Sequence, residues 1–147
     1  MTRLTMTTAG ESHGPGGFAI VTGLPADLPI DIETINHELG RRQGGYGRGG
    51  RQRIESDQVE VLSGTRHGLT TGAPITLSVP NRDSRLDDPE QTPPVHRPRP
   101  GHADLAGAAK FGTDDCRNIL ERASARQTAV RVAGGALAGC LLREVGI

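Results

Sequence analysis

Two histidines lie far apart in the chain, each in a glycine-containing segment that is typical of a turn. His13 lies in Gly10–Gly14 (GESHG), and His102 lies in Arg97–Asp104 (RPRPGHAD). Because a histidine with its ordinary pKa of about 6.5 gains or loses a proton near neutral pH, both are candidates for acid–base chemistry. The plain alternative is that each is a solvated or structural loop residue. The groups that accompany them decide between the two interpretations.

A group of arginines surrounds the glycine-rich residues 44–50, and its members are Arg41, Arg42, Arg48, Arg51 and Arg53. A flexible loop of this kind can fold guanidinium groups around a phosphate or carboxylate, each pairing through two N–H groups. A solvated basic loop is the alternative. The segment Arg48–Arg51 (RGGR) also resembles the RGG segments of RNA-binding proteins, but its single copy and one neighbouring aromatic, Tyr46, argue against that function.

A second candidate anion site precedes the last predicted helix. Ser124–Gln127 (SARQ) has the capping-box pattern and predicts a helix that runs to about Glu144. Such a helix start offers free backbone N–H groups and the positive end of the helix dipole, and Arg122 and Arg126 flank it. A role of Ser124 in capping alone is the alternative.

Short strands must position the His13 loop. The apolar residues of Leu4–Met6 and Phe18–Leu24 predict two strands with His13 between them. Alternating apolar residues at 59–61 and 75–79, separated by glycine-containing turns, predict further strands of an antiparallel sheet.

Helices and one long loop account for the rest of the chain. Asp31 is the predicted N-cap of a helix, and the glycines at 40, 44 and 45 are predicted to end that helix. Residues 81–100 contain five prolines and no apolar period, which predicts an exposed loop that delivers His102, followed by a short helix over Ala103–Phe111. The final helix is apolar nearly all round, so we expect it to be buried on more than one face, by another subunit or by a continuation of the chain.

The composition narrows the class of protein. With 147 residues the chain has the length of one domain, and its formal net charge of zero gives no reason to expect nucleic acid or an anionic membrane as a partner. Cys116 and Cys140 lack the spacing of a zinc site, so we expect reduced thiols and no metal. Neither a signal peptide nor a membrane span is recognisable, and the expected location is cytoplasmic.

Four segments, in their order along the chain, closely resemble motifs of the chorismate synthase family. They are the His13 segment Gly10–Gly14, the arginine loop from Arg41 to Arg48, the His102 segment Arg97–Asp104 and the segment Glu121–Arg126 (ERASAR). The likeness runs through all 147 residues. Members of the family are well over twice as long, so the resemblance covers only their N-terminal part.

The resemblance implies an α+β fold in which an antiparallel sheet packs on helices, as part of the family's β-α-β sandwich. Residues 1–147 would form a single domain, the N-terminal portion of that fold, within a homotetramer. The implied reaction is the anti-1,4-elimination of phosphate and a C6 hydrogen from 5-enolpyruvylshikimate 3-phosphate to give chorismate. This carbon–oxygen lyase step of the shikimate pathway, which leads to aromatic amino acids, requires reduced FMN, although no net oxidation or reduction occurs.

The resemblance also implies roles for particular residues. His13 would protonate the departing phosphate, and His102 would lie beside the flavin and protonate or neutralise its reduced ring. The residues that match the family's FMN-contacting triplet are Arg122, Ala123 and Ser124. Those that match positions for the phosphate of the substrate, or of NADPH as the reductant in some members, are Arg42, Arg48 and Arg126.

The later segments of the family bring further flavin contacts, substrate arginines and an aspartate for proton removal, and they are absent from these 147 residues. We therefore expect no turnover by this chain alone. A non-catalytic fragment that binds a phosphorylated ligand or FMN is the alternative. An RNA-binding protein that acts through Arg41–Arg53 is a remote one.

Overall fold

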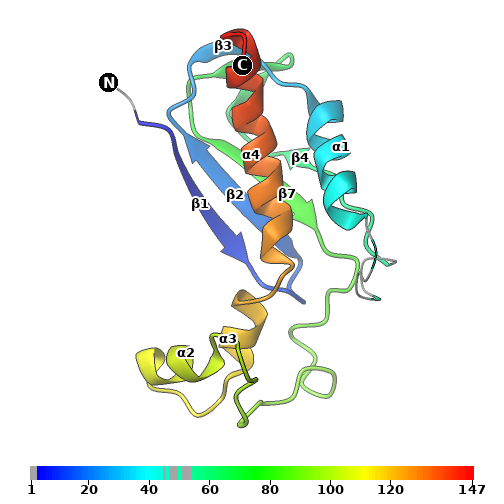
Figure 1. The fold of residues 1–147 in the computed structure, drawn as a ribbon, viewed down its shortest axis with the longest axis vertical. Coiled ribbons are helices and arrows are strands. Elements are labelled where there is room, and N and C mark those ends of the chain that lie inside the picture. The colour runs from blue at the N-terminus through cyan, green and yellow to red at the C-terminus, as the bar shows by residue number, and fades with distance from the viewer. Residues whose placement is uncertain (1–2, 45, 47–49, 51–53) are drawn as a thin grey trace.

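The computed structural model describes residues 3–44, 46, 50 and 54–147. Its elements, in chain order, are β1 (Thr5–Gly10), β2 (Gly16–Thr22), β3 (Ala26–Pro29), α1 (Ile32–Gln43), β4 (Glu60–Val61), β5 (Thr65–Arg66), β6 (Leu69–Thr71), β7 (Ile75–Pro80), α2 (Asp104–Phe111), α3 (Arg117–Arg122) and α4 (Gln127–Glu144). Antiparallel strands pack against α1 and α4 (Figure 1), so the predicted α+β class is confirmed.

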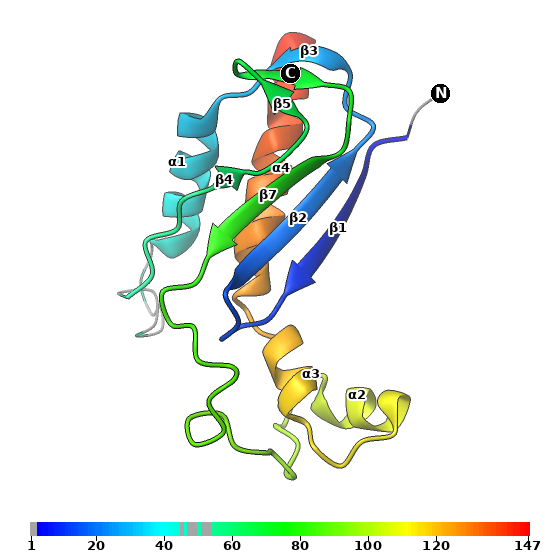
Figure 2. The ribbon, with the colours of Figure 1, turned by 180° about the vertical axis from the view of Figure 1, so that it is seen from behind.

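The larger sheet has the strand order β1-β2-β7-β4, and its pairs are antiparallel. Alternate residues of β2 define its two faces, because Ala19 and Val21 are buried whereas Ile20 is 43% exposed. Both helices lie on one side of the sheet (Figures 1 and 2), which matches the alternation of an antiparallel sheet covered on one face. The predicted strands around residues 4–6, 18–24, 59–61 and 75–79 are confirmed as β1, β2, β4 and β7.

The first helix forms for the reason that the sequence indicates. The carboxylate of Asp31 accepts a hydrogen bond from the backbone N–H of Thr34 at 2.9 Å, which satisfies one of the free donors of the first turn. Ile35 and Leu39 are fully buried in the core, and α1 packs along α4. The helix continues through Gly40 to Gln43 and ends at Gly44, so the predicted N-cap is confirmed and the predicted end is close.

The last helix lies on the sheet and packs along α1, which lies beside it on the same face (Figure 1). Its buried residues, among them Val130, Ala133 and Leu137, face β1, β2 and β7, while another side contacts α1. Gly134 allows this close approach, because a Cβ there would overlap the sulfur of Met6. Two sides of α4 are thus covered within the chain, and its last turn is exposed, with Leu142 at 46%.

Residues 81–103 contain no helix or strand and descend from β7 to a small helical unit of α2 and α3 (Figures 1 and 2), as the long-loop prediction expects. The loop is tied to that unit by hydrogen bonds from the Cys116 N–H to the Val95 carbonyl at 2.7 Å and from the Arg117 side chain to the Pro93 carbonyl at 2.9 Å. The sequence predicted α2 but not the six-residue α3. Among the described residues, no helix is both long and apolar enough to cross a membrane.

Candidate functional site

The His13 loop joins β1 to β2, as predicted, and two features shape it. Gly10 ends β1 with a φ of +100°, and a Cβ at this position would overlap the carbonyl oxygen of Gly16, so glycine is required there. The side-chain amide of Asn81 donates hydrogen bonds to the backbone carbonyls of Glu11 at 3.1 Å, Ser12 at 3.1 Å and Gly14 at 2.8 Å. A residue at the end of β7 therefore holds the loop in one conformation.

The imidazole of His13 lies between α3 and the segment that follows β7. Its Nδ1 is 3.0 Å from both carboxylate oxygens of Glu121, and its backbone N–H donates to the same carboxylate at 2.9 Å. On the other side, Nε2 is 3.6 Å from the carboxylate of Asp83 and 3.5 Å from the guanidinium of Arg85. The His13 side chain is 17% exposed and that of Glu121 is 1% exposed, so solvent reaches the ring from the Nε2 side.

A small cavity adjoins this side of the loop. It has a volume of about 360 Å³, and its lining residues are Gly14, Pro15, Ser84, Arg85, Leu86, Asp87 and Asp88. The backbone N–H groups of Arg85 and Leu86 both donate to the carbonyl of His13, at 2.8 and 2.9 Å. The 84–88 segment therefore wraps around the histidine and provides both a cation and a space next to it.

Arg42 and Arg126, two of the predicted phosphate-binding residues, meet at one buried carboxylate. Asp57 accepts from Arg126 at 2.5 Å through one oxygen and from Arg42 at 2.6 Å through the other. Arg126 also donates to the Asn81 side chain at 2.6 Å, and it lies 3.8 Å from the carboxylate of Glu55. The structure thus brings the two arginines together, and Arg48, the third predicted member, lies outside the described residues.

Sequence reasoning missed the partners of these arginines. Asp57 has no side-chain exposure, and Asn81 is 8% exposed. Neither lies in a motif that the sequence singled out. Asp57 is 69 residues from Arg126 in the sequence, and Asn81 is 45 residues from it. A local sequence pattern cannot predict contacts between residues so far apart.

The predicted capping box at Ser124 is wrong. Helix α4 begins at Gln127, its N-cap Arg126 has helical backbone angles, and no side chain caps it. A capping serine needs an extended backbone at the N-cap, whereas here the Ser124 hydroxyl accepts from the N–H of Arg126 at 3.2 Å within a turn. The side chain of Gln127 bonds the carbonyl of Gly10 at 2.5 Å and does not reach back to Ser124.

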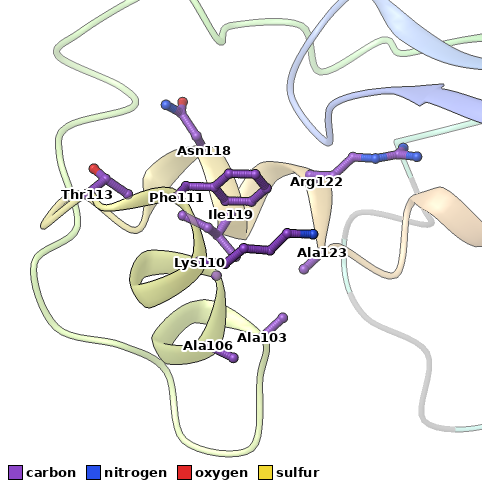
Figure 3. Close-up of a pocket in the computed structure, with 10 residues that line it drawn as sticks. Ala103, Ala106, Lys110, Phe111, Thr113, Asn118, Ile119, Arg122 and Ala123 are labelled. Carbon is purple, nitrogen blue, oxygen red and sulfur yellow. The ribbon is translucent and has the colours of Figure 1, made fainter.

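The predicted flavin triplet lies where α3 turns into α4. The guanidinium of Arg122 points away from α2 and toward β1 (Figure 3), where it donates to the carbonyls of Thr8 at 2.6 Å and Gly10 at 3.2 Å. Arg122 therefore ties α3 to the start of the His13 loop. Ala123 follows as the C-cap of α3, and Ser124 makes the hydrogen bond to Arg126 described above.

A cavity of about 700 Å³ lies between α2 and α3 (Figure 3), and its lining residues are Ala103, Ala106, Gly107, Lys110, Phe111, Thr113, Asn118, Ile119, Arg122 and Ala123. The lining is mostly apolar, and its volume is typical of a site for a small molecule. The ammonium group of Lys110 lies 5.3 Å from the centre of the Phe111 ring. Two of the three predicted flavin residues, Arg122 and Ala123, thus border an apolar cavity.

His102 lies in an exposed turn before α2, next to this cavity's Ala103. Gly101, with a φ of +72°, forms the turn, and Arg99 closes it by donating to the carboxylate of Asp104 through Nε and Nη2, both at 2.8 Å. These hydrogen bonds from Arg99 lower the pKa of the buried Asp104 to about 2. No hydrogen bond or ion pair in the described part of the chain joins His102 to His13.

Comparison with known proteins identifies the arrangement. The family profile described as chorismate synthase matches residues 4–147. A protein of Thermoanaerobacter pseudethanolicus named chorismate synthase is 60% identical over 140 residues, which cover 95% of this chain and 40% of that protein. One of Limosilactobacillus fermentum with the same name is 56% identical over 155 residues, covering 98% of this chain and 40% of its own length.

A solved structure agrees with these relatives. A crystal structure of chorismate synthase superposes with a TM-score of 0.73 at 46% identity, over 99% of this chain and 36% of the solved one. The chain thus spans about two-fifths of the length of the relatives that it matches. With the profile matching nearly every residue, the chain belongs to the chorismate synthase family.

Proposed function

We propose that this chain forms the phosphate-side part of a chorismate synthase active site, a lyase site for the elimination of phosphate from 5-enolpyruvylshikimate 3-phosphate. The observation that carries the proposal is the setting of His13, whose partly exposed ring has its Nε2 3.5 Å from the guanidinium of Arg85, a residue that lines the adjoining cavity. A phosphate group leaves more readily when a proton and a cation meet its developing negative charge.

In this proposal His13 is the general acid. Its Nε2 is the nitrogen that can reach a ligand, since Glu121 occupies Nδ1. Proton transfer from Nε2 to a phosphate oxygen neutralises charge on the leaving group and leaves a neutral imidazole. Arg85, 3.5 Å from Nε2, would then stabilise the phosphate that has been released.

Arg42 and Arg126 supply positive charge near this acid, and we propose that they attract the anionic groups of the substrate. Asp57 pairs with both guanidinium groups and Glu55 lies 3.8 Å from that of Arg126, so buried carboxylates hold the two arginines in position. Such an arrangement spares the cost of ordering two long side chains when an anion binds. The proposal includes Arg48, and the phosphate of NADPH is the second anion that these arginines could take.

The cavity between α2 and α3 fits part of a flavin. Its apolar lining suits a planar ring, and Gly107 keeps the two helices close, because a Cβ there would overlap Ile119. We propose that Arg122, Ala123 and Ser124 hold reduced FMN from one side and that His102, next to Ala103, faces the ring. When bound, the reduced flavin supplies the transient electron that assists loss of phosphate.

The remaining parts of the proposal concern assembly and location. We propose a homotetramer in the cytoplasm that acts on a small-molecule substrate, without a nucleic-acid or membrane partner. The last turn of α4, which includes Leu142, is exposed. An exposed apolar residue there supports the proposal that a further chain segment or another subunit covers that end of the helix.

A calorimetric titration tests the proposal. The 147-residue chain is titrated with 5-enolpyruvylshikimate 3-phosphate, with and without reduced FMN, and we expect binding that strengthens when the flavin is present. The variant H13N should weaken it, whereas H96N, which changes a histidine side chain that is 63% exposed, is the matched control and should not. Binding of substrate that ignores both flavin and His13 would favour a non-catalytic binding fragment instead.

An assay of turnover completes the test. Chorismate formation is followed with reduced FMN and substrate, and we expect none from the 147-residue chain alone, because it spans about 40% of its relatives. Turnover by this chain alone would show that the later segments are dispensable and would refute this part of the proposal.

A further inference from the structure

Glu121 is a buried carboxylate for which the sequence suggests no role. It lies in the last turn of α3, its side chain is 1% exposed, and the guanidinium of Arg117 lies 3.5 Å from one of its oxygens. An ionised carboxylate at such a depth is costly unless its oxygens are paired. Here the shorter contacts to the carboxylate, of 2.9 and 3.0 Å, come from the His13 loop.

The contacts between Glu121 and this loop are several and mutually dependent. The carboxylate accepts from the backbone N–H of His13 at 2.9 Å and lies 3.0 Å from the ring Nδ1, while the backbone carbonyl of Glu121 accepts from the N–H of Ser12 at 3.0 Å. Glu121 therefore binds the His13 loop through both its backbone and its side chain, and it contacts both the backbone and the side chain of that loop. The imidazole cannot turn without losing a bond to a buried charge.

This geometry determines which nitrogen of the neutral ring carries the hydrogen. A carboxylate accepts hydrogen bonds and donates none, so Nδ1 must be the donor. The second nitrogen, Nε2, is then the one that gains and loses the proton. We infer that Glu121 is a positioning residue that holds the Nδ1–H form of His13 and keeps Nε2 directed at the departing phosphate, an inference that rests on the proposed function.

The groups on the opposite side of the ring fit both protonation states of Nε2. When Nε2 carries no hydrogen, the guanidinium of Arg85 can donate toward it from 3.5 Å. When Nε2 is protonated, the carboxylate of Asp83 at 3.6 Å faces it. In the transfer, the Nε2–H bond breaks and an O–H bond forms on the phosphate, and the neutral imidazole keeps its Nδ1–H on Glu121. Asp83 thus suits the protonated Nε2 before the transfer, and Arg85 suits the Nε2 without hydrogen after it.

Nitrogen NMR of the imidazole tests the inference without substrate or flavin. Long-range proton–nitrogen spectra of the uniformly ¹⁵N-labelled 147-residue chain, recorded at a pH above the titration of the ring, distinguish a nitrogen that bears hydrogen from one that does not. We expect His13 to have its hydrogen on Nδ1, whereas the exposed His96 serves as an internal reference for the solvated mixture of forms. A His13 that carries its hydrogen mainly on Nε2 would overturn the inference.

The variant E121Q provides the second measurement. A carboxamide carries no charge, and a donor NH₂ group replaces one of the two carboxylate oxygens that lie 3.0 Å from Nδ1, so the hydrogen bond from Nδ1–H loses its charged acceptor. The ratio of the Nδ1–H to the Nε2–H form should fall by about tenfold or more, the effect of losing one hydrogen bond to a charged group. The control E33Q changes an exposed glutamate of α1 and should leave the ratio unaltered.

The outcomes separate the inference from the proposed function. An unchanged ratio in a folded E121Q chain would refute the inference, and if E121Q does not fold, the wild-type spectrum alone decides it. If His13 has the Nδ1–H form but H13N leaves flavin-dependent substrate binding intact, the positioning by Glu121 stands while the role of His13 toward phosphate fails.

Discussion

Replacement of Asp57 by asparagine should destabilise the fold strongly, because two buried cations donate hydrogen bonds to this carboxylate and only Arg126 has a second carboxylate nearby, that of Glu55 at 3.8 Å. The Asp57 side chain has no exposure, and those of Arg126 and Arg42 are 7% and 11% exposed. In D57N the amide oxygen can still accept from one guanidinium, but the NH₂ group faces the other as donor against donor. Removing one partner of a buried ion pair costs about 3–5 kcal/mol, and we expect the free energy of unfolding to fall by that amount.

Urea denaturation followed by circular dichroism measures the change. The wild-type chain, D57N and the control D114N are compared at neutral pH, and D114N, whose side chain is 95% exposed, should differ from wild type by no more than about 0.5 kcal/mol. Replacing Arg42 by methionine in the D57N background removes one of the uncompensated charges. The double variant should therefore recover part of the loss.

A small loss would contradict this reasoning. If D57N lowers the free energy of unfolding by less than about 1 kcal/mol with an unchanged slope against urea, Asp57 does not compensate the two arginines as the distances of 2.5 and 2.6 Å indicate. If the double variant is less stable than D57N, the charge of Arg42 is not what makes the loss large.

Three further changes test other parts of the structure. Hydrogen bonds from Arg99 lower the pKa of Asp104 from 3.8 to about 2, so this carboxylate stabilises the folded chain above pH 4 and loses its contribution as the pH falls toward 2. The difference in unfolding free energy between wild type and D104N should be at most about 2 kcal/mol near pH 6, since Arg99 is partly exposed. This difference should shrink between pH 4 and pH 2. A difference that stays constant over this range would contradict the prediction. G10A should cost about 2 kcal/mol or more by urea denaturation, because alanine at a φ of +100° is strained and its Cβ meets Gly16, and a loss below 0.5 kcal/mol would speak against a fixed turn. D31A should lower the midpoint of urea denaturation, because the Thr34 N–H loses its acceptor, and an unaltered midpoint would show that the cap contributes nothing.

Local patterns predicted the elements that are long or capped by a side chain. The alternation at 75–79 predicts β7, and Asp31 with its following apolar residues predicts α1. The six residues of α3 are too few to show a helical period, and β5 and β6, which the sequence did not predict, have two and three residues. Ser124 misled because a sequence pattern cannot distinguish an extended N-cap from a turn that is already helical.

For the site, residue types indicated candidate functional groups but not the residues that hold them in place. His13 and Arg126 stand out because histidine and arginine have specific chemistry in glycine-rich or helix-flanking segments. Glu121 contacts His13 across 108 residues, so its role depends on the fold and leaves no spacing signal.

Asn81 links the His13 loop to Arg126, and through Asp57 to Arg42, in one hydrogen-bonded unit. Its NH₂ group donates to three carbonyls of the His13 loop, and its oxygen accepts from Arg126 at 2.6 Å. Because an amide side chain is planar, the position of the Arg126 guanidinium and the conformation of the His13 loop depend on the same rigid group. The candidate acid and the candidate cationic groups are therefore not independent parts of the structure. A change at Asn81 would disturb both, while Glu121 holds the ring of His13 from the other side.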